Sequence, residues 1–213
     1  MKVQTKIMER LIPGVNRHYG EASPTLRQHL IRYRFAAAYI RKNDRVLDAA
    51  CGSGYGAFIL AKAGAEVVGI DCSNEAIAYA NHTYNHERIS WKCLRLEEYS
   101  GLSEYFHRIT CFETLEHLTD PELIIRAFAR MMRKDGLLLC SVPIVPTKHF
   151  DSFHLHDFDE NFILDLLCSC GFHCIDRLLQ ESTILTIVAA MDEYPDLEPR
   201  PINSIDISGE TPV

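Results

Sequence analysis

The sequence lacks the long apolar segments that mark membrane proteins and secreted precursors. No run in the 213 residues approaches the ~20 apolar residues that a transmembrane helix needs. Residues 1–10 contain no apolar stretch of the kind found in signal peptides. The chain also contains no internal repeat. We therefore expect a cytoplasmic protein with no membrane span.

Paired metal-binding cysteine motifs are also absent. The chain has eight cysteines, but no CxxC is matched by a second one, as a zinc ribbon or finger would require. Most of these cysteines lie within apolar runs, where a reduced cysteine behaves as a small hydrophobic residue. We expect the thiols to be reduced.

Basic residues are fewer than acidic ones. The chain has 22 Lys and Arg against 29 Asp and Glu, a formal charge of −7. Proteins that grip long nucleic acids neutralise phosphates with clustered Lys and Arg, so this balance disfavours such a partner. Hydrophobic residues make up 47% of the chain, which is enough to bury a core in one α/β domain with a modest appendage.

Short apolar runs alternate with helical patterns along most of the chain. This alternation predicts βαβ units and a doubly wound, three-layer αβα fold with seven strands. The gap at residues 180–182 favours a hairpin that places an antiparallel last strand in the sheet. The strands are expected at 46–47, 66–70, 89–93, 108–112, 137–142, 172–179 and 183–190, and the helices at 24–41, 55–63, 74–84, 121–133 and 159–171.

The chain divides into three regions. Residues 1–41 are expected to form an N-terminal arm and a capping helix, and residues 42–191 the domain itself. Residues 192–213 are rich in proline and acidic residues and are expected to form a flexible tail.

A glycine-rich segment follows the first strand. In an open α/β sheet, ligands bind at the carboxyl ends of the strands where strand order reverses. Gly52 and Gly54 allow torsions and close approaches that a Cβ would obstruct. Asp71 ends the next strand and can accept hydrogen bonds from both ribose hydroxyls. Asp48 ends the first strand, where a carboxylate suits the ammonium of an amino-acid moiety and would repel a pyrophosphate. These features favour a nucleoside bearing an amino acid over a dinucleotide.

The segments VLDAACGSGYG (46–56) and VVGIDCSNEAI (67–77) resemble motifs I and II of the class I S-adenosylmethionine-dependent methyltransferases, which have a Rossmann-like fold. The likeness covers roughly residues 28–190. It implies that the aspartates and the glycine loop hold S-adenosylmethionine and that Cys72 lies near its adenine. The cofactor-binding residues expected are Tyr33, Asp48, Ala50, Gly52, Ser53, Gly54, Tyr55, Asp71, Cys72, Leu96, Glu97 and Phe112.

The adenine side departs from the family pattern. These methyltransferases often place an acid after the third strand to meet the adenine amine, and here the run is Cys93-Leu-Arg-Leu-Glu-Glu98. Glu97 or a backbone amide is the expected substitute. The flanking segments resemble small methyltransferases of bacterial glycan and natural-product pathways. By that resemblance the arm and the first helix cap the cofactor site, with Arg32 or Tyr33 reaching the cofactor.

The acceptor side is expected in the loops after the fourth and fifth strands. These loops carry Glu113, Glu116, His117 and His154. Methyl transfer to a hydroxyl needs a group that removes the proton, and histidine titrates near neutrality. His154 or His117 is the expected base, with Glu113 beside it.

A metal-binding interpretation competes with that one. ExxEH followed by a later histidine resembles the metal site of methyltransferases that modify the 2′-hydroxyl of small-RNA 3′ ends, and of some ubiquinone-pathway O-methyltransferases. Glu113, Glu116, His117 and His154 would then bind Mg²⁺ or Mn²⁺ and lower the pKa of a bound hydroxyl. Purely structural roles for Glu116 and His117 are the third alternative.

The sequence thus predicts methyl transfer from S-adenosylmethionine to a small acceptor, a hydroxyl of a sugar, glycan precursor or natural product. The first alternative is a metal-dependent O-methyltransferase that acts on an RNA-terminal ribose or a quinol. An NAD(P)-dependent oxidoreductase and an inactive cofactor-binding scaffold are further alternatives. A homodimer is left open.

Overall fold

The computed structural model describes residues 24–191 and Pro199. The expected N-terminal arm (1–23) and all of the expected C-terminal tail except Pro199 lie outside the described residues.

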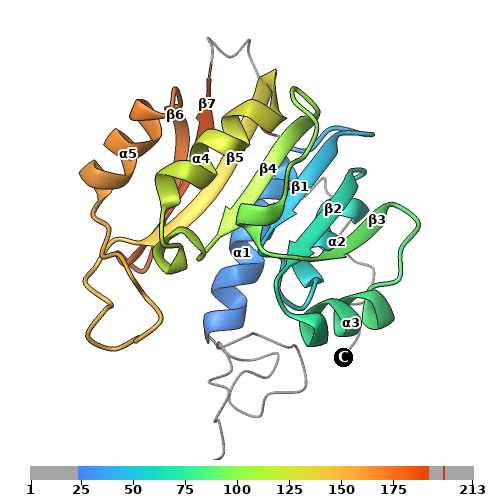
Figure 1. Cartoon of the computed structure of the whole chain (residues 1–213), viewed down its shortest axis with the longest axis horizontal. Coiled ribbons are helices and arrows are strands. Elements are labelled where there is room, and N and C mark those ends of the chain that lie inside the picture. The colour runs from blue at the N-terminus through green and yellow to red at the C-terminus, as the bar shows by residue number, and fades with distance from the viewer. Residues whose placement is uncertain (1–23, 192–198, 200–213) are drawn as a thin grey trace, which may run out of the picture.

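Seven strands form one mixed sheet in the order β3-β2-β1-β4-β5-β7-β6 (Figure 1). Strands β1 to β5 pair in parallel, and β7 runs antiparallel to its two neighbours, β5 and β6, so that β7 is the one strand of this sheet that runs in the opposite direction. This confirms the seven-stranded Rossmann-like sheet with an antiparallel last strand. The strands are β1 (Arg45–Ala49), β2 (Glu66–Asp71), β3 (Ile89–Cys93), β4 (Phe106–Phe112), β5 (Met132–Pro143), β6 (His173–Gln180) and β7 (Ile184–Ala190).

Helices cover both faces of the sheet (Figure 1). On one face α1 and α2 pack over a core that includes Val46, Leu137 and Val188, and on the other α4 and α5 pack over a core that includes Leu47, Ile109 and Ile187. Strand residues alternate between the two cores because successive side chains of a strand point to opposite faces. The helices are α1 (Pro24–Ala38), α2 (Tyr55–Lys62), α3 (Asn74–Thr83), α4 (Pro121–Met131) and α5 (Glu160–Ser169), with short 3₁₀ turns η1 (Leu96–Glu98) and η2 (Leu115–His117).

The expected hairpin joins β6 to β7. Glu181 and Ser182 have φ of 48° and 58°, and the amide of Thr183 donates to the carbonyl of Gln180 at 3.0 Å. Two consecutive left-handed residues match the right-handed twist of the flanking strands. The turn therefore fixes the antiparallel pairing that gives this sheet its mixed edge.

Three predicted boundaries differ from the structure. The helix expected to reach Arg133 ends at Met131, because Met132 already pairs with Phe106 of β4. The chain then leaves the β4 register until Leu137 pairs with Arg108, so the strand expected at 137–142 is the second part of a longer, irregular β5. The first helix was expected to reach residue 41 and ends at Ala38; turn-like hydrogen bonds continue through Ile40.

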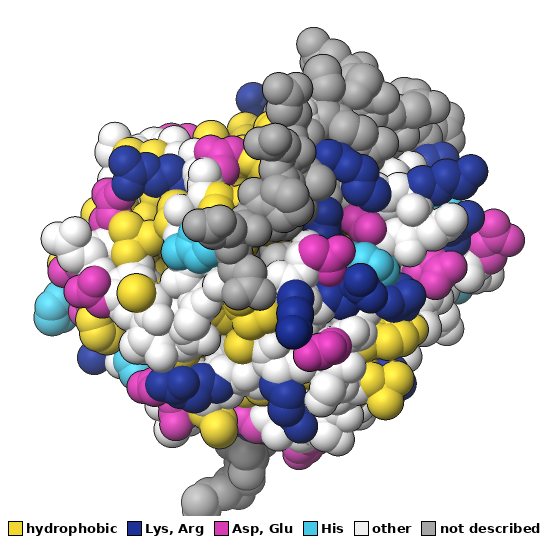
Figure 2. All heavy atoms as spheres, turned by 90° about the horizontal axis from the view of Figure 1, so that it is seen from above, with side chains coloured by type: hydrophobic (Ala, Val, Ile, Leu, Met, Phe, Trp, Pro, Cys, Tyr) yellow, Lys and Arg dark blue, Asp and Glu magenta, His cyan; other side chains and the backbone are white. Residues whose placement is uncertain are grey.

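No helix in the described part of the chain is both long and apolar enough to cross a bilayer. On the face in Figure 2, Lys and Arg side chains are interspersed with Asp and Glu rather than gathered in one patch. The cytoplasmic location and the exclusion of long nucleic acids stay predictions.

Candidate cofactor and acceptor site

Asp48 lies at the carboxyl end of β1 and is completely buried. Its Oδ1 accepts hydrogen bonds from the Tyr33 hydroxyl at 3.0 Å and from Thr110 Oγ1 at 2.7 Å. Its Oδ2 makes no well-aligned hydrogen bond among the described residues. Burial raises the pKa of Asp48 to about 7, and the two hydroxyl donors and the backbone amide of Ala57 act on the carboxyl and oppose the rise. A buried carboxylate with one unmatched oxygen is suited to a cationic group of a ligand.

The glycine loop leaves space next to this carboxylate. Gly52 has φ of 54°, and a Cβ added there would meet nothing within 4 Å. Gly54 has φ of 90°, and a Cβ there would lie 2.6 Å from the Cβ of Ala80. Ala50 adopts φ of 58°, a strained conformation for a residue with a Cβ. The loop is therefore tightly packed against Ala80 at Gly54 and has free space beside Gly52. A loop that holds a ligand needs such space.

Asp71 ends β2 and faces the same loop. Its Oδ2 accepts a hydrogen bond from the Gly52 amide at 3.0 Å, and its Oδ1 accepts one from the Ser73 amide at 2.8 Å. A carboxylate has about four lone-pair sites and can accept several hydrogen bonds at once, and the expected ribose contact of Asp71 stays a prediction. The interaction also ties the glycine loop to the end of the neighbouring strand.

Three aromatic rings close the site on the side of α1. The ring of Tyr33 makes edge-to-face contacts with Phe112, at 5.0 Å between centroids, and with Tyr55, at 5.7 Å. All three side chains are buried. Gly56 lies directly against Tyr33, because a Cβ at Gly56 would fall 2.0 Å from the ring. The first helix is thus packed against the start of α2 through Tyr33, and contact of Tyr33 with the cofactor stays a prediction.

Cys72 and Glu97, which are expected to lie near adenine, are more exposed than Asp48. Cys72 is exposed at the end of β2, and Ser53 is buried within the loop. Leu96 and Glu97 lie in η1, where Glu97 Oε1 accepts a hydrogen bond from Arg95 Nη2 at 2.9 Å. The structure thus gives the Glu97 carboxylate a partner of its own, and its role toward adenine stays a prediction.

Glu113 follows β4 on the acceptor side. Its φ is 48°, and its amide donates to the Ser141 carbonyl at 3.1 Å. Ser141 Oγ donates to Glu113 Oε1 at 2.7 Å, which anchors the carboxylate to β5. Ala50 after β1 and Glu113 after β4 thus both have a strained backbone. Strained residues are common at functional sites.

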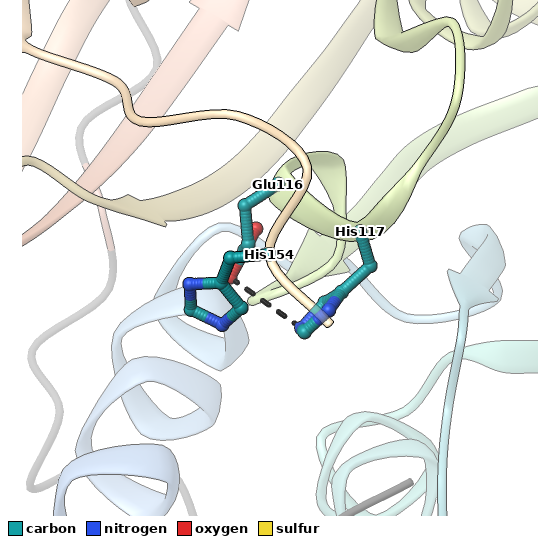
Figure 3. Close-up of side chains that lie close together, drawn as sticks. All are labelled: Glu116, His117 and His154. Atoms are coloured by element: carbon teal, nitrogen blue, oxygen red, sulfur yellow. Dashed lines mark ion pairs between the residues drawn. The ribbon is translucent and has the colours of Figure 1, made fainter. Parts of the chain in front are cut away.

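Glu116, His117 and His154 form a compact group (Figure 3). One ligand atom from each lies within 4.8 Å of the others, and Glu116 Oε1 lies 4.0 Å from His117 Nε2. Opposite ligands of a small divalent cation are separated by about 4 Å, so these distances suit one ion. Glu113, which the sequence also assigns to this site, lies outside the group.

The ring of His117 is oriented so that its Nε2 atom faces Glu116. His117 Nδ1 lies 3.2 Å from the Phe153 carbonyl, which can only accept, so Nδ1 carries the hydrogen and Nε2 keeps its lone pair. Burial lowers the pKa of His117, which favours the neutral ring. Metal-binding histidines commonly use such a carbonyl contact to fix the ring.

Glu116 is the buried member of the group. It is 1% exposed, and its Oε2 has no hydrogen-bond partner among the described residues. Burial raises its pKa well above the ordinary value, and the charge of Glu113 adds to the rise. A bound cation would hold this carboxylate in its ionised form. The donor set therefore fits a divalent metal.

The loop after β5 carries His154 to this place. The amides of Leu155 and His156 donate to the Glu116 carbonyl at 2.7 and 3.2 Å, which fastens the loop to η2. His154 Nδ1 lies 2.5 Å from Thr147 Oγ1, and its Nε2 lies 3.5 Å from Asp151 Oδ2. The contacts with the Glu116 carbonyl join segments that are far apart in the sequence, whereas Thr147 and Asp151 belong to the same loop as His154.

Sequence reasoning missed several supporting residues. Thr110 supports Asp48, and Ser141 supports Glu113. Thr110 stands opposite Asp48 in the β1–β4 pairing and Ser141 opposite Phe112 in the β4–β5 pairing, so only the strand register could have identified them.

Comparison with known proteins agrees with this geometry. Residues 22–181 match the family model described as a methyltransferase domain. A ubiquinone biosynthesis O-methyltransferase of Hydrogenovibrio crunogenus is 30% identical over 67% of this chain and 59% of its own length. A protein of Mycobacterium tuberculosis named "Probable S-adenosylmethionine-dependent methyltransferase" is 29% identical over 80% of this chain and 62% of its own. The chain thus matches about three fifths of the length of these relatives.

A solved structure shares the fold. The 1,6-didemethyltoxoflavin-N1-methyltransferase of Burkholderia thailandensis, with bound 1,6-didemethyltoxoflavin and S-adenosylhomocysteine, superposes with a TM-score of 0.61. It is 18% identical, over 79% of this chain and 90% of that one. The chain belongs to the methyltransferase-domain family, and its class is that of the S-adenosylmethionine-dependent class I methyltransferases.

Proposed function

We propose that the chain methylates a hydroxyl of a small acceptor with vicinal hydroxyls, such as a quinol or catechol, with a divalent cation held by Glu116, His117 and His154. The observation that carries the proposal is the approach of these three side chains to within 4.8 Å. The ubiquinone-pathway names of some relatives support it.

Each residue of the proposed site has a chemical task. S-adenosylmethionine, when bound, supplies an electrophilic methyl group on a sulfonium. Asp48 and Asp71 would hold the methionine and ribose portions of the cofactor, and Tyr33 would fix the Asp48 carboxylate through its hydroxyl. Correct placement of the acceptor oxygen in line with the methyl group accounts for much of the catalysis in such a displacement.

The acceptor-side residues would manage the proton of the hydroxyl. A divalent cation lowers the pKa of a coordinated hydroxyl. Glu116 and the Nε2 atom of His117 would hold the cation, while Phe153 and Thr147 keep the two imidazoles oriented. Glu113 is held by Ser141 beside this group and would receive or relay the proton.

The experiment measures S-adenosylhomocysteine formed from catechol by the purified chain, with and without chelator. We expect chelation to slow the reaction by about 100-fold or more, because metal activation of a nucleophile is worth several kcal/mol. Added Mg²⁺ or Mn²⁺ should restore it. Direct titration of the cofactor-loaded protein with Mn²⁺ should show a single site.

Variants tie the effect to the proposed residues. Glu116→Gln should weaken Mn²⁺ binding, whereas His149→Ala, an exposed histidine on the same loop, serves as the matched control. Unchanged Mn²⁺ affinity in Glu116→Gln would contradict the metal site.

A second candidate is metal-free methylation of a hydroxyl of a sugar, glycan precursor or natural product. The proximity of His154 to Asp151, at 3.5 Å, favours it, because a carboxylate beside an imidazole supports a general base. Turnover of catechol or a sugar acceptor that is insensitive to chelator and lost in His154→Ala would favour this candidate over the first.

A further inference from the structure

Four of the cysteines are exposed. The eight cysteines all lie in the described part of the chain, and no disulfide joins any of them there. Four are buried, whereas Cys72, Cys93, Cys168 and Cys174 are exposed. Oxidants reach exposed thiols most readily. In reducing compartments the disulfides that do form are usually transient and sense the redox state. The exposed cysteines are therefore the ones that can respond to an oxidant.

Cys72 and Cys93 are neighbours at the carboxyl edge of the sheet. Strands β2 and β3 lie side by side and run parallel (Figure 1), and Asp71 at the end of β2 pairs with Cys93 at the end of β3. Cys72 is the residue after Asp71, and the Cys93 thiol donates to its carbonyl oxygen at 3.8 Å. The thiol of Cys174, by contrast, contacts the Asp176 carbonyl of its own strand.

The separation of Cys72 and Cys93 suits a disulfide. Neighbouring strands lie about 4.8 Å apart and rise about 3.3 Å per residue. A residue one position beyond a paired residue therefore lies about 6 Å from the partner, and the Cα atoms of disulfides are usually about 4.4–6.8 Å apart. Cys72 lies in a bend after β2, so the alternation of the sheet does not fix the direction of its side chain. Rotation of the side chains can then bring the two sulfurs together.

Arg95 lies near the same pair. Its pKa is raised mainly by the hydrogen bond and the charge of Glu97, and the charge of Cys72 adds to the rise. The Arg95 guanidinium is therefore within electrostatic reach of the Cys72 sulfur. A cation near a cysteine favours the thiolate, which is the form that reacts with oxidants.

The pair also adjoins the residues expected to bind ribose. Asp71 accepts hydrogen bonds from the Gly52 and Ser73 amides, so Cys72 lies between two residues of that network. The Ser73 side chain in turn accepts a hydrogen bond from the Ala76 amide at the start of α3. A bond that draws Cys72 toward β3 would therefore disturb both Asp71 and the turn into α3.

We propose that Cys72 and Cys93 form a reversible disulfide when the protein meets hydrogen peroxide, and that this bond weakens binding of the cofactor. The effect on the cofactor rests on the proposed function, in which Asp71 holds the ribose. The chain would then bind its methyl donor well only in the reduced state.

The oxidation takes place in two displacement steps. One thiolate attacks hydrogen peroxide, so that an S–O bond forms, the O–O bond breaks, and the leaving hydroxide takes up a proton to become water. The other cysteine loses its proton and attacks the resulting sulfenic acid, so that the S–S bond forms, the S–O bond breaks, and a second water leaves. The two sulfurs together give up two electrons, which the peroxide accepts. A dithiol such as dithiothreitol reverses the change.

The first experiment treats the purified chain with equimolar hydrogen peroxide. Peptide mapping without reductant should find the peptides of Cys72 and Cys93 linked, and dithiothreitol should separate them. Calorimetric titration should show that S-adenosylhomocysteine binds the oxidised protein about tenfold or more weakly than the reduced protein. Dithiothreitol should restore the affinity.

Variants tie the effect to the pair. Cys93→Ser should bind S-adenosylhomocysteine equally well before and after peroxide. Cys168→Ser, which removes an exposed cysteine of α5, is the matched control and should respond as the wild type does. A loss of affinity in oxidised Cys93→Ser as large as that in the wild type would overturn the proposal.

Linkage provides a second measurement. If the disulfide weakens S-adenosylhomocysteine binding by some factor, saturating S-adenosylhomocysteine must make the disulfide easier to reduce by the same factor. Equilibration with mixtures of reduced and oxidised dithiothreitol, with and without S-adenosylhomocysteine, measures that shift. Equal shifts would support the proposal, and an unchanged reduction equilibrium would overturn it.

Two further outcomes separate this proposal from the placement of the cofactor. Absence of the linked peptides, or equal affinities of the oxidised and reduced protein, would overturn the disulfide switch and leave the cofactor site intact. Wild-type affinity in Asp71→Asn would overturn the placement of the ribose, whereas the linked peptides and the change in affinity on oxidation are measured without it.

Discussion

The carboxyl group of Asp48 should make the affinity for the cofactor depend on pH. Burial raises its pKa to about 7, so a large fraction of the unliganded protein carries a protonated Asp48 at pH 6 to 7. The ammonium of S-adenosylhomocysteine would favour the ionised form, so binding would release a proton. The affinity should therefore rise with pH up to about 7, by as much as about tenfold per unit, and then level off.

Isothermal titration with S-adenosylhomocysteine from about pH 5.5 to about pH 8 measures this dependence. Repeating the titrations in buffers of different ionisation enthalpy counts the protons released. Asp48→Asn is the matched variant, because its amide oxygen can still accept from Tyr33 and Thr110. It should bind more weakly above pH 7 and show no rise with pH.

The stability of the free protein gives an independent check with a stated sign. A carboxyl whose folded pKa lies above its unfolded value stabilises the fold at low pH and loses that contribution as pH rises from about 4 to about 7. The full change is about 4 kcal/mol, from about three units at 1.36 kcal/mol each. Asp48→Asn should therefore gain stability relative to wild type across this window in urea unfolding. An S-adenosylhomocysteine affinity that is flat with pH in the wild type, or equally steep in Asp48→Asn, would refute the reasoning.

Two further variants probe the cradle. Gly56→Ala should destabilise the protein by about 1–3 kcal/mol in urea unfolding, because its Cβ would overlap the ring of Tyr33, and Tyr33→Leu in the same chain should recover part of that loss. Additive costs of the two changes would argue against the overlap. Asp71→Asn should weaken S-adenosylhomocysteine by about tenfold or more, because the amide loses the charge and offers a donor where the Gly52 and Ser73 amides need acceptors. Wild-type affinity in that variant would exclude Asp71 from ribose binding.

The cofactor cradle was predictable because its chemistry is contiguous in the sequence. Asp48 and the glycine loop fall within one short segment, and Asp71 ends the next strand, so the order of strands alone brings them together. Thr110 was not predictable in the same way. Its role depends on the register of β1 with β4, which places it opposite Asp48.

The acceptor side was predictable in part. Glu116 and His117 are adjacent, but His154 reaches them only because the loop after β5 folds back onto the Glu116 carbonyl. Glu113 was expected in the same group and instead bonds to Ser141 of β5, a contact that follows from the pairing of β4 with β5 rather than from the ExxEH spacing. Arg32 is completely buried, and the helical pattern of the sequence does not reveal which polar residue of the first helix is buried.

Asp48 at the cofactor end of the site and Glu116 at the acceptor end have similar electrostatic surroundings. Asp48 and Glu116 are both buried, each has one unmatched oxygen, and burial raises the pKa of each. Each would therefore exchange a proton for a cation, the ammonium of the cofactor at Asp48 and a divalent metal at Glu116. Raising the pH should strengthen both exchanges, and single substitutions should separate them. Asp48→Asn should remove the pH dependence of S-adenosylhomocysteine binding and leave that of Mn²⁺, whereas Glu116→Gln should do the reverse. If either substitution changed both dependences equally, the two carboxyls would have to be treated as one coupled site.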